Sequence, residues 1–99
     1  MVHWSTADTE LATMAHALGH PARVKLLRRL AIDGAAEVKV LVKHMGLAQS
    51  TVSEHLRFLR EAGLVTALRK GRQVRYSVSS IQLRHFLRLA SALAVRLGP

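Results

Sequence analysis

Cysteine is absent from the 99-residue sequence, and acidic residues are few, with 6 Asp and Glu against 15 Lys and Arg. Without cysteine, the chain excludes disulfides, thiolate zinc sites, cysteine nucleophiles and thiol redox sensing. No apolar run approaches the roughly 18–20 residues of a membrane span, and residues 1–4 lack the basic and apolar regions of a signal peptide. We therefore expect a soluble, cytoplasmic protein that does not interact with membranes.

The residue patterns of common enzymes are missing as well. The sequence contains no paired carboxylates, phosphate-binding loop, catalytic triad or cluster of metal ligands. We therefore expect no catalytic residues, no cofactor and no enzymatic activity.

What the sequence does contain is typical of one folded and strongly basic domain. The hydrophobic fraction of 49% is that of globular proteins, and the formal net charge of +9 favours an anionic partner. Most of the excess charge lies in residues 49–99, and its densest stretch, Arg69–Arg75, has four bases and no acid. Because no repeat, linker or low-complexity tract divides the chain, residues 1–99 are predicted to form a single domain.

Helical periodicity predicts two helices in the first third of the chain. The first begins near Ser5, where Ser5 and Asp8 resemble a capping box, and extends to about residue 18. Pro21 suits the first turn of a second helix, which ends at Asp33 and Gly34. We expect this second helix to bury Val24, Leu27, Leu30 and Ala31, with Arg23, Lys25, Arg28 and Arg29 at its margins.

A helix-turn-helix is predicted over residues 37–62. Its first helix carries an apolar stripe of Val38, Leu41, Val42 and Met45 and ends at Gly46. A short turn leads to a second helix from about Gln49 to Ala62, with Val52, Leu56 and Leu59 facing inward. Two helices joined by three or four residues that include glycine are typical of this motif.

From residue 64 the apolar period changes to two, which predicts a β-hairpin over residues 64–78. Strands 64–68 and 74–78 are joined by a loop in which Gly71 can take a positive φ. Ser79 or Ser80 then caps a last helix over residues 80–97. The predicted fold is mainly α with a small β-hairpin: a winged helix-turn-helix with five helices and a two-stranded wing.

Residues 47–65 (LAQSTVSEHLRFLREAGLV) resemble the recognition helix and first wing strand of the ArsR/SmtB family of bacterial winged-helix repressors. Two further segments agree with the family, namely residues 17–23 (ALGHPAR) and the wing at residues 69–78 (RKGRQVRYSV). The resemblance extends over residues 8–97 without a large gap. Ala48 departs from the Ser or Pro often found there in the family, which predicts one missing capping bond.

The resemblance implies a homodimer that binds a double-stranded DNA operator, represses its own operon and is released by an inducer. The first and last helices (6–18 and 80–97) would form the dimer interface, and the recognition helix would enter the major groove. The first and last helices are apolar on more than one face, so each must be buried on two sides, one against the core and the other against a partner subunit. The alternative to this dimer is a tightly packed monomer. The predicted interface residues are Leu11, Met14, Leu83, Phe86, Leu87, Ala90, Leu93 and Leu97.

The outward side of the recognition helix and the wing are the predicted DNA-contacting surface. Short Ser and Thr side chains allow close approach to DNA, Gln49 can pair with adenine, and Arg57 with guanine or phosphate. Basic residues at the wing suit phosphate contacts. The predicted residues are Gln49, Ser50, Thr51, Ser53, Glu54, Arg57, Arg69, Lys70 and Arg72. The alternative is that Ser and Thr only cap the helix and that the charges are solvated.

The six histidines complete neither metal site expected from the resemblance. The site on the last helix needs carboxylates or further histidines, whereas this helix contains only His85. The site before the recognition helix needs cysteines, where this chain has Glu37 and Lys39. We therefore predict no metal site, and leave open only whether histidines form a weak nickel or copper site. The inducer is an unidentified small molecule or metal ion.

Two functions compete with sequence-specific regulation. A nucleoid-type architectural protein would share the basic charge but would need no ordered recognition surface. The polar, non-basic patch of Gln49, Ser50, Thr51 and Ser53 favours base recognition instead. A protein-binding adaptor, the third class, would not bind DNA even at low salt.

Overall fold

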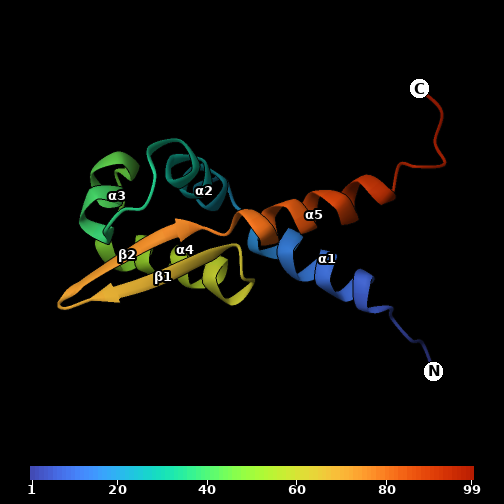
Figure 1. Ribbon diagram of the computed structural model, residues 1–99, viewed down its shortest axis with the longest axis horizontal. Coiled ribbons are helices and arrows are strands. Elements are labelled where there is room, and N and C mark those ends of the chain that lie inside the picture. Colours follow the sequence, from blue (N-terminus) through green and yellow to red (C-terminus); the bar gives the residue numbers. More distant parts are fainter.

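The computed structural model describes residues 1–99 (Figure 1). It confirms the predicted order of elements: four helices, then one β-hairpin, then a fifth helix. The elements are α1 (Thr6–Ala17), α2 (Pro21–Asp33), α3 (Val38–Met45), α4 (Gln49–Glu61), β1 (Val65–Lys70), β2 (Gln73–Val78) and α5 (Ser80–Ala92). None of these helices has the length and apolar character needed to cross a membrane.

The helices α1 and α5 lie side by side and extend away from the other elements (Figure 1). The molecule is therefore elongated, with extents of 46 × 34 × 22 Å. Both chain ends lie on the side to which α1 and α5 extend, and the tip of the β1–β2 hairpin lies at the opposite end (Figure 1). Two separate surfaces result, one formed by α1 and α5 and one by α4 with the wing.

The buried core joins α1, α2, α3, α4 and the start of β1. Its residues are Met14, Ala17, Leu26, Leu27, Leu30, Leu41, Val52, Leu56, Leu59, Ala62, Leu64 and Val65. No residue of α5 is fully buried, although its Leu83, Phe86 and Leu89 pack against the edge of this core. The inner face of α4 is therefore held firmly, as the apolar pattern of α4 predicted, while α5 is held only along one side.

The buried face of α2 differs from the prediction. Leu26 is 0% exposed and Arg23 only 8%, whereas Val24 is 42% exposed and Ala31 is also exposed. The prediction was therefore wrong for Val24 and Ala31, and for Arg23, which we expected at the helix margin. The physical reason is that the Arg23 guanidinium lies over the Phe58 ring, 4.3 Å from its centroid, and so occupies a position on the inner face.

Local sequence determines where the helices begin. The Ser5 hydroxyl accepts a hydrogen bond from the Asp8 N–H (3.0 Å) and the Asp8 carboxylate accepts one from the Ser5 N–H (3.2 Å), which confirms the capping box. At α2, His20 Nδ1 accepts the Ala22 N–H at 3.0 Å. Ala48 provides no side-chain cap for α4, as predicted.

The wing strands are longer, and their connection shorter, than predicted. Residues 65–70 pair antiparallel with residues 73–78, which leaves only Gly71 and Arg72 in the turn. Gly71 takes a φ of +64°, and a positive φ at the first position of a two-residue hairpin turn favours glycine. Tyr76 exchanges two backbone hydrogen bonds with Ala36 (3.0 and 2.8 Å), so that the wing is fixed to the segment between α2 and α3.

The last helix is shorter than predicted. The Ser79 hydroxyl caps α5 by accepting the Gln82 N–H (3.3 Å), as expected, but α5 ends at Ala92 rather than at residue 97. The following turns are held by bonds between residues three apart, such as Leu97 N–H to Ala94 C=O (3.0 Å). Leu93 and Leu97, both predicted interface residues, therefore lie beyond α5.

Candidate nucleic-acid interface

The outer side of α4 carries all the DNA-contacting residues predicted for that helix. Val52, Leu56 and Leu59 turn into the core and are at most 1% exposed. With one turn every 3.6 residues, this burial leaves the opposite side in solvent. The exposed residues there are Gln49, Ser50, Thr51, Ser53, Glu54 and Arg57. Since Ala48 provides no side-chain cap, no side chain accepts a bond from the first-turn N–H groups, which can bind an anion.

Arg57, a predicted contact to guanine or phosphate, is held by two carboxylates of its own helix. Its Nε donates to Glu54 (3.1 Å) and its Nη1 to Glu61 (2.7 Å). The hydrogen bond from Arg57 is the main cause that lowers the pKa of Glu54, and both carboxylates raise the pKa of Arg57. Glu54 and Glu61 therefore hold Arg57 in the free chain, and release of one carboxylate would free further N–H groups of Arg57 to bind DNA.

The predicted wing residues Arg69, Lys70 and Arg72 are exposed at the end of the hairpin. Because side chains alternate along a strand, Arg69 and Lys70 point to opposite faces of the two-stranded sheet. Lys70 shares a shallow hollow with Leu68, Gln73 and Arg75. The basic charge of the wing is therefore divided between its two faces.

A cluster that the sequence analysis missed lies beside α4, where the start of α2 approaches it. The Arg23 guanidinium stacks on the Phe58 ring. The centroids of the His20 and His55 rings are 4.6 Å apart. Burial is the main cause that lowers the pKa of His55, and the neighbouring His20 and Arg23 lower it further. The spacing of Arg23 with Leu26, Leu27 and Leu30 places all four on one helix face, but this pattern does not show that a charged residue on that face is buried.

The predicted dimer surface on α1 and α5 is partly open in the single chain. Leu87 is 53% exposed, and beyond α5 Leu93 and Leu97 are 74% and 73% exposed. The side chains of Leu11, Leu83, Phe86 and Ala90 are half-buried. Met14 is only 1% exposed and lies inside the core of its own protomer, because α1 packs this face against α2 and α4. Its placement at a dimer interface was therefore wrong.

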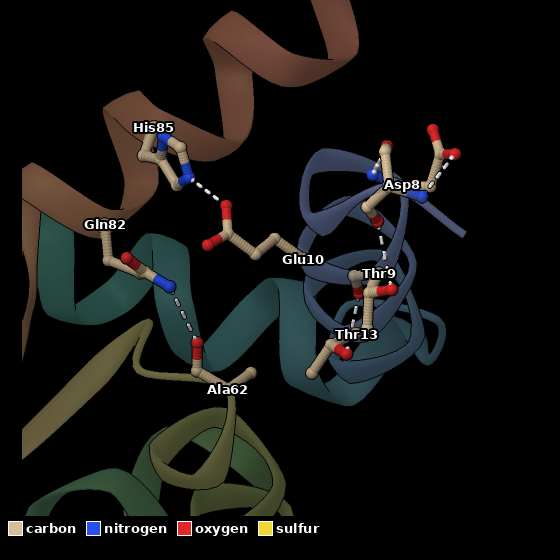
Figure 2. Close-up of polar contacts among 8 residues, drawn as sticks. Asp8, Thr9, Glu10, Thr13, Ala62, Gln82 and His85 are labelled. Atoms are coloured by element: carbon tan, nitrogen blue, oxygen red, sulfur yellow. Dashed lines mark hydrogen bonds and ion pairs between the residues drawn. The ribbon is translucent and has the colours of Figure 1, made fainter. Parts of the chain in front are cut away.

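Two polar contacts fix α5 relative to the other helices (Figure 2). His85 Nε2 lies 2.6 Å from a carboxylate oxygen of Glu10 on α1, and Gln82 Nε2 donates to the Ala62 carbonyl at the end of α4 (3.2 Å). These contacts orient the exposed apolar side chains of α5 relative to α4.

No group of three or more potential metal-ligating side chains lies close enough together to hold a metal ion. His85 contacts Glu10, and His44 Nδ1 lies 3.1 Å from Nη2 of Arg29.

Comparison with known proteins agrees with this geometry. Residues 20–67 match the family described as "Bacterial regulatory protein, arsR family". The HTH-type transcriptional regulator CmtR of Mycobacterium tuberculosis is 42% identical over 76 residues, which cover 77% of this chain but only 64% of CmtR. A "Probable mercury resistance operon repressor" of Streptomyces lividans is 37% identical over 83 residues, covering 84% of this chain and 66% of that protein.

Among solved structures, the chain is similar to a "homodimeric winged helix-turn-helix DNA-binding domain" from Mycobacterium bovis, described as a possible ArsR-family transcriptional regulator. The two are 25% identical with a TM-score of 0.71, and the similarity covers 99% of this chain and 94% of the other.

Proposed function

The chain belongs to the ArsR family of bacterial regulatory proteins, and from this premise we propose that it is a sequence-specific, DNA-binding transcriptional regulator. It acts as a homodimeric repressor of its own operon and binds an inverted-repeat operator. This function has no catalytic step and needs no cofactor. It implies a cytoplasmic location on the nucleoid.

The observation that carries this proposal is the exposed polar side of α4. Its first turns present amide and hydroxyl groups rather than a row of bases, and the buried inner face holds them in a fixed orientation. In this proposal Gln49 and Ser53 contact base edges, Ser50 and Thr51 contact the backbone, and Arg57 binds guanine or phosphate after leaving Glu61. Arg69, Lys70 and Arg72 bind phosphates along the adjacent backbone.

Homodimerisation is supported by the surface of α5. No residue of this helix is fully buried, and Leu87 and the following Leu93 expose apolar area that a second copy would cover. The M. bovis domain, similar over 99% of this chain, is described as homodimeric. A two-fold dimer presents two copies of α4, which matches an operator with two-fold symmetry.

The test is a selection of bound sequences from a pool of random duplexes, followed by affinity measurements on the selected sequence and on bulk DNA. A regulator binds its operator typically 10³–10⁷ times more tightly than bulk DNA. Equal affinity for both would favour the architectural function, and no binding at low salt would favour the protein-binding adaptor.

The inducer is a small molecule or a metal ion. The S. lividans relative is named for mercury resistance, but soft metal ions prefer thiolate ligands and these 99 residues contain no cysteine. We therefore propose that the inducer of this chain is not a mercury or arsenic ion bound by cysteine thiolates.

A further inference from the structure

A hollow beside α4 contains cationic groups to which the proposed DNA contacts assign no role. It lies between the start of α2 and one side of α4, and its volume is ≈ 420 Å³. Its lining includes His20, Arg23 and His55 together with Ser50 and Thr51. Because Ser50 and Thr51 belong to the exposed side of α4, the hollow lies directly beside the proposed DNA-contacting surface.

Arg23 is a buried cation without hydrogen-bond acceptors. It is 8% exposed, and its Nε and Nη1 atoms are buried without a partner. The Phe58 ring beneath the guanidinium attracts the charge but does not replace the acceptors that a guanidinium needs. Buried charged groups are normally paired, so the guanidinium of Arg23 is suited to an anionic partner.

Three imidazole rings, which can donate N–H hydrogen bonds, lie around Arg23 and Phe58. His55 Nδ1 is buried without a partner, and the His20 ring packs against the His55 ring. From α1, the His16 ring packs edge-to-face with the Phe58 ring, with 6.3 Å between ring centroids. Glu54 is the one carboxylate that lines the hollow, and Arg57 already neutralises it.

We propose that this hollow binds a phosphodiester group of the DNA backbone, with Arg23 as the buried cation and His20 and His55 as further donors. The hydroxyls of Ser50 and Thr51 lie at the rim and complete the site. A phosphate offers several acceptor oxygens, which suits the planar fork of an arginine. This inference rests on the proposed function, since α4 must enter the major groove for a flanking phosphate to reach the hollow.

The direct test measures affinity for a random-sequence 30-base-pair duplex between 50 and 200 mM salt. Losing a phosphate contact lowers the slope of log affinity against log salt by about 0.9, or about 1.8 for a dimer with two such sites. Arg23→Gln should therefore lower the slope by this amount and weaken binding at least about tenfold. The matched control is Arg28→Gln, which removes the same charge from an exposed position of α2 and should leave the slope nearly unchanged.

Two further variants separate phosphate binding from folding. Arg23→Lys keeps the cation and should recover most of the slope. His20→Asn keeps a good N-cap for α2 but removes the imidazole, so it should weaken binding without a large change in thermal midpoint.

If Arg23→Gln fails to fold, the pH dependence of duplex affinity tests the phosphate site instead. Burial and neighbouring cations hold the pKa of His55 below its ordinary value in the free chain, and a phosphate would raise it. Binding would then take up protons, and affinity for the duplex should increase as pH falls from 8 to 6. His55→Gln should flatten this dependence.

Each outcome is decisive. Equal salt slopes for folded Arg23→Gln and Arg28→Gln, or an unaltered pH profile in His55→Gln, would overturn the phosphate site while DNA binding stands. A shift of the wild-type His55 resonance with inorganic phosphate, combined with wild-type duplex binding by Arg23→Gln, would make this a free-anion site and also overturn it. Failure of the wild-type chain to bind the duplex at 50 mM salt would overturn the proposed function itself.

Discussion

Replacing Leu87 by glutamate should separate the proposed homodimer into folded monomers. Leu87 is 53% exposed in the single chain, so about half of its side chain remains for a partner to cover. Burying a whole leucine contributes about 1.5–3 kcal/mol, which gives about 1 kcal/mol for this half. A two-fold interface contains the contact twice, so Leu87→Ala should weaken dimerisation by about 2 kcal/mol, or roughly 30-fold in Kd.

Glutamate should have a larger effect, because it also places a carboxylate among apolar groups without a partner. The Leu87→Glu variant should be monomeric at micromolar concentration and should lose operator affinity together with the dimer. Sedimentation equilibrium measures the oligomeric state, and circular dichroism checks that the helices are retained. Phe86→Glu, at a half-buried residue that packs against the core, would damage the protomer as well and is the weaker test.

The matched control is Val40→Glu on α3. Val40 is 41% exposed, so the chemical change and the starting exposure are similar, but α3 does not belong to the α1–α5 surface. This variant should remain dimeric. A folded Leu87→Glu variant that dimerises with the wild-type Kd would refute the assignment of α5 to the interface.

Four other predictions concern DNA, metals and the core. If the dimer neutralises about 6–10 phosphates, affinity measured by fluorescence anisotropy should fall about a thousandfold or more between 50 and 200 mM salt. Arg72→Gln should weaken all sequences alike, whereas Gln49→Ala should reduce discrimination at one base pair of each half-site by about 1–3 kcal/mol; equal losses on all sequences for both would contradict these roles. Zinc, cadmium, arsenite and peroxide at micromolar levels should change operator binding by less than about 1 kcal/mol. A regulatory metal needs several ligands in one geometry, and peroxide finds no cysteine thiol to oxidise. A reversible release that His85→Ala abolishes would contradict this. Leu26→Ala should lower the free energy of unfolding in urea by about 2–5 kcal/mol and Val24→Ala by far less, and the reverse order would contradict the observed buried face of α2.

The inner face of α4 and the capping box of α1 were predictable because both depend on local patterns. Val52, Leu56 and Leu59 repeat at helical spacing, and their burial requires no knowledge of what they pack against. Ser5 and Asp8 satisfy each other within one turn. Such features follow from residues that are close in the sequence.

Met14 and Arg23 were misplaced because their surroundings are built by distant segments. Met14 shares an apolar stripe with the predicted interface, and only the packing of α1 against α2 and α4 shows that it faces its own protomer. Arg23 is charged, which made a margin position the natural expectation. Phe58, 35 residues later in the chain, provides the ring that allows Arg23 to be buried.

The sequence by itself determined the order of elements, the helix-turn-helix and the basic wing, because apolar period, glycine turns and charge are local properties of the chain. Only the tertiary structure decided which residues of α2 are buried and which side chains of α5 remain exposed. It also brought His20, the N-cap of α2, and Arg23 on α2 beside His55 on α4. Periodicity shows that a helix has an apolar side. The residues that cover this side come from distant parts of the sequence, and a local pattern does not show which of them lie close in space.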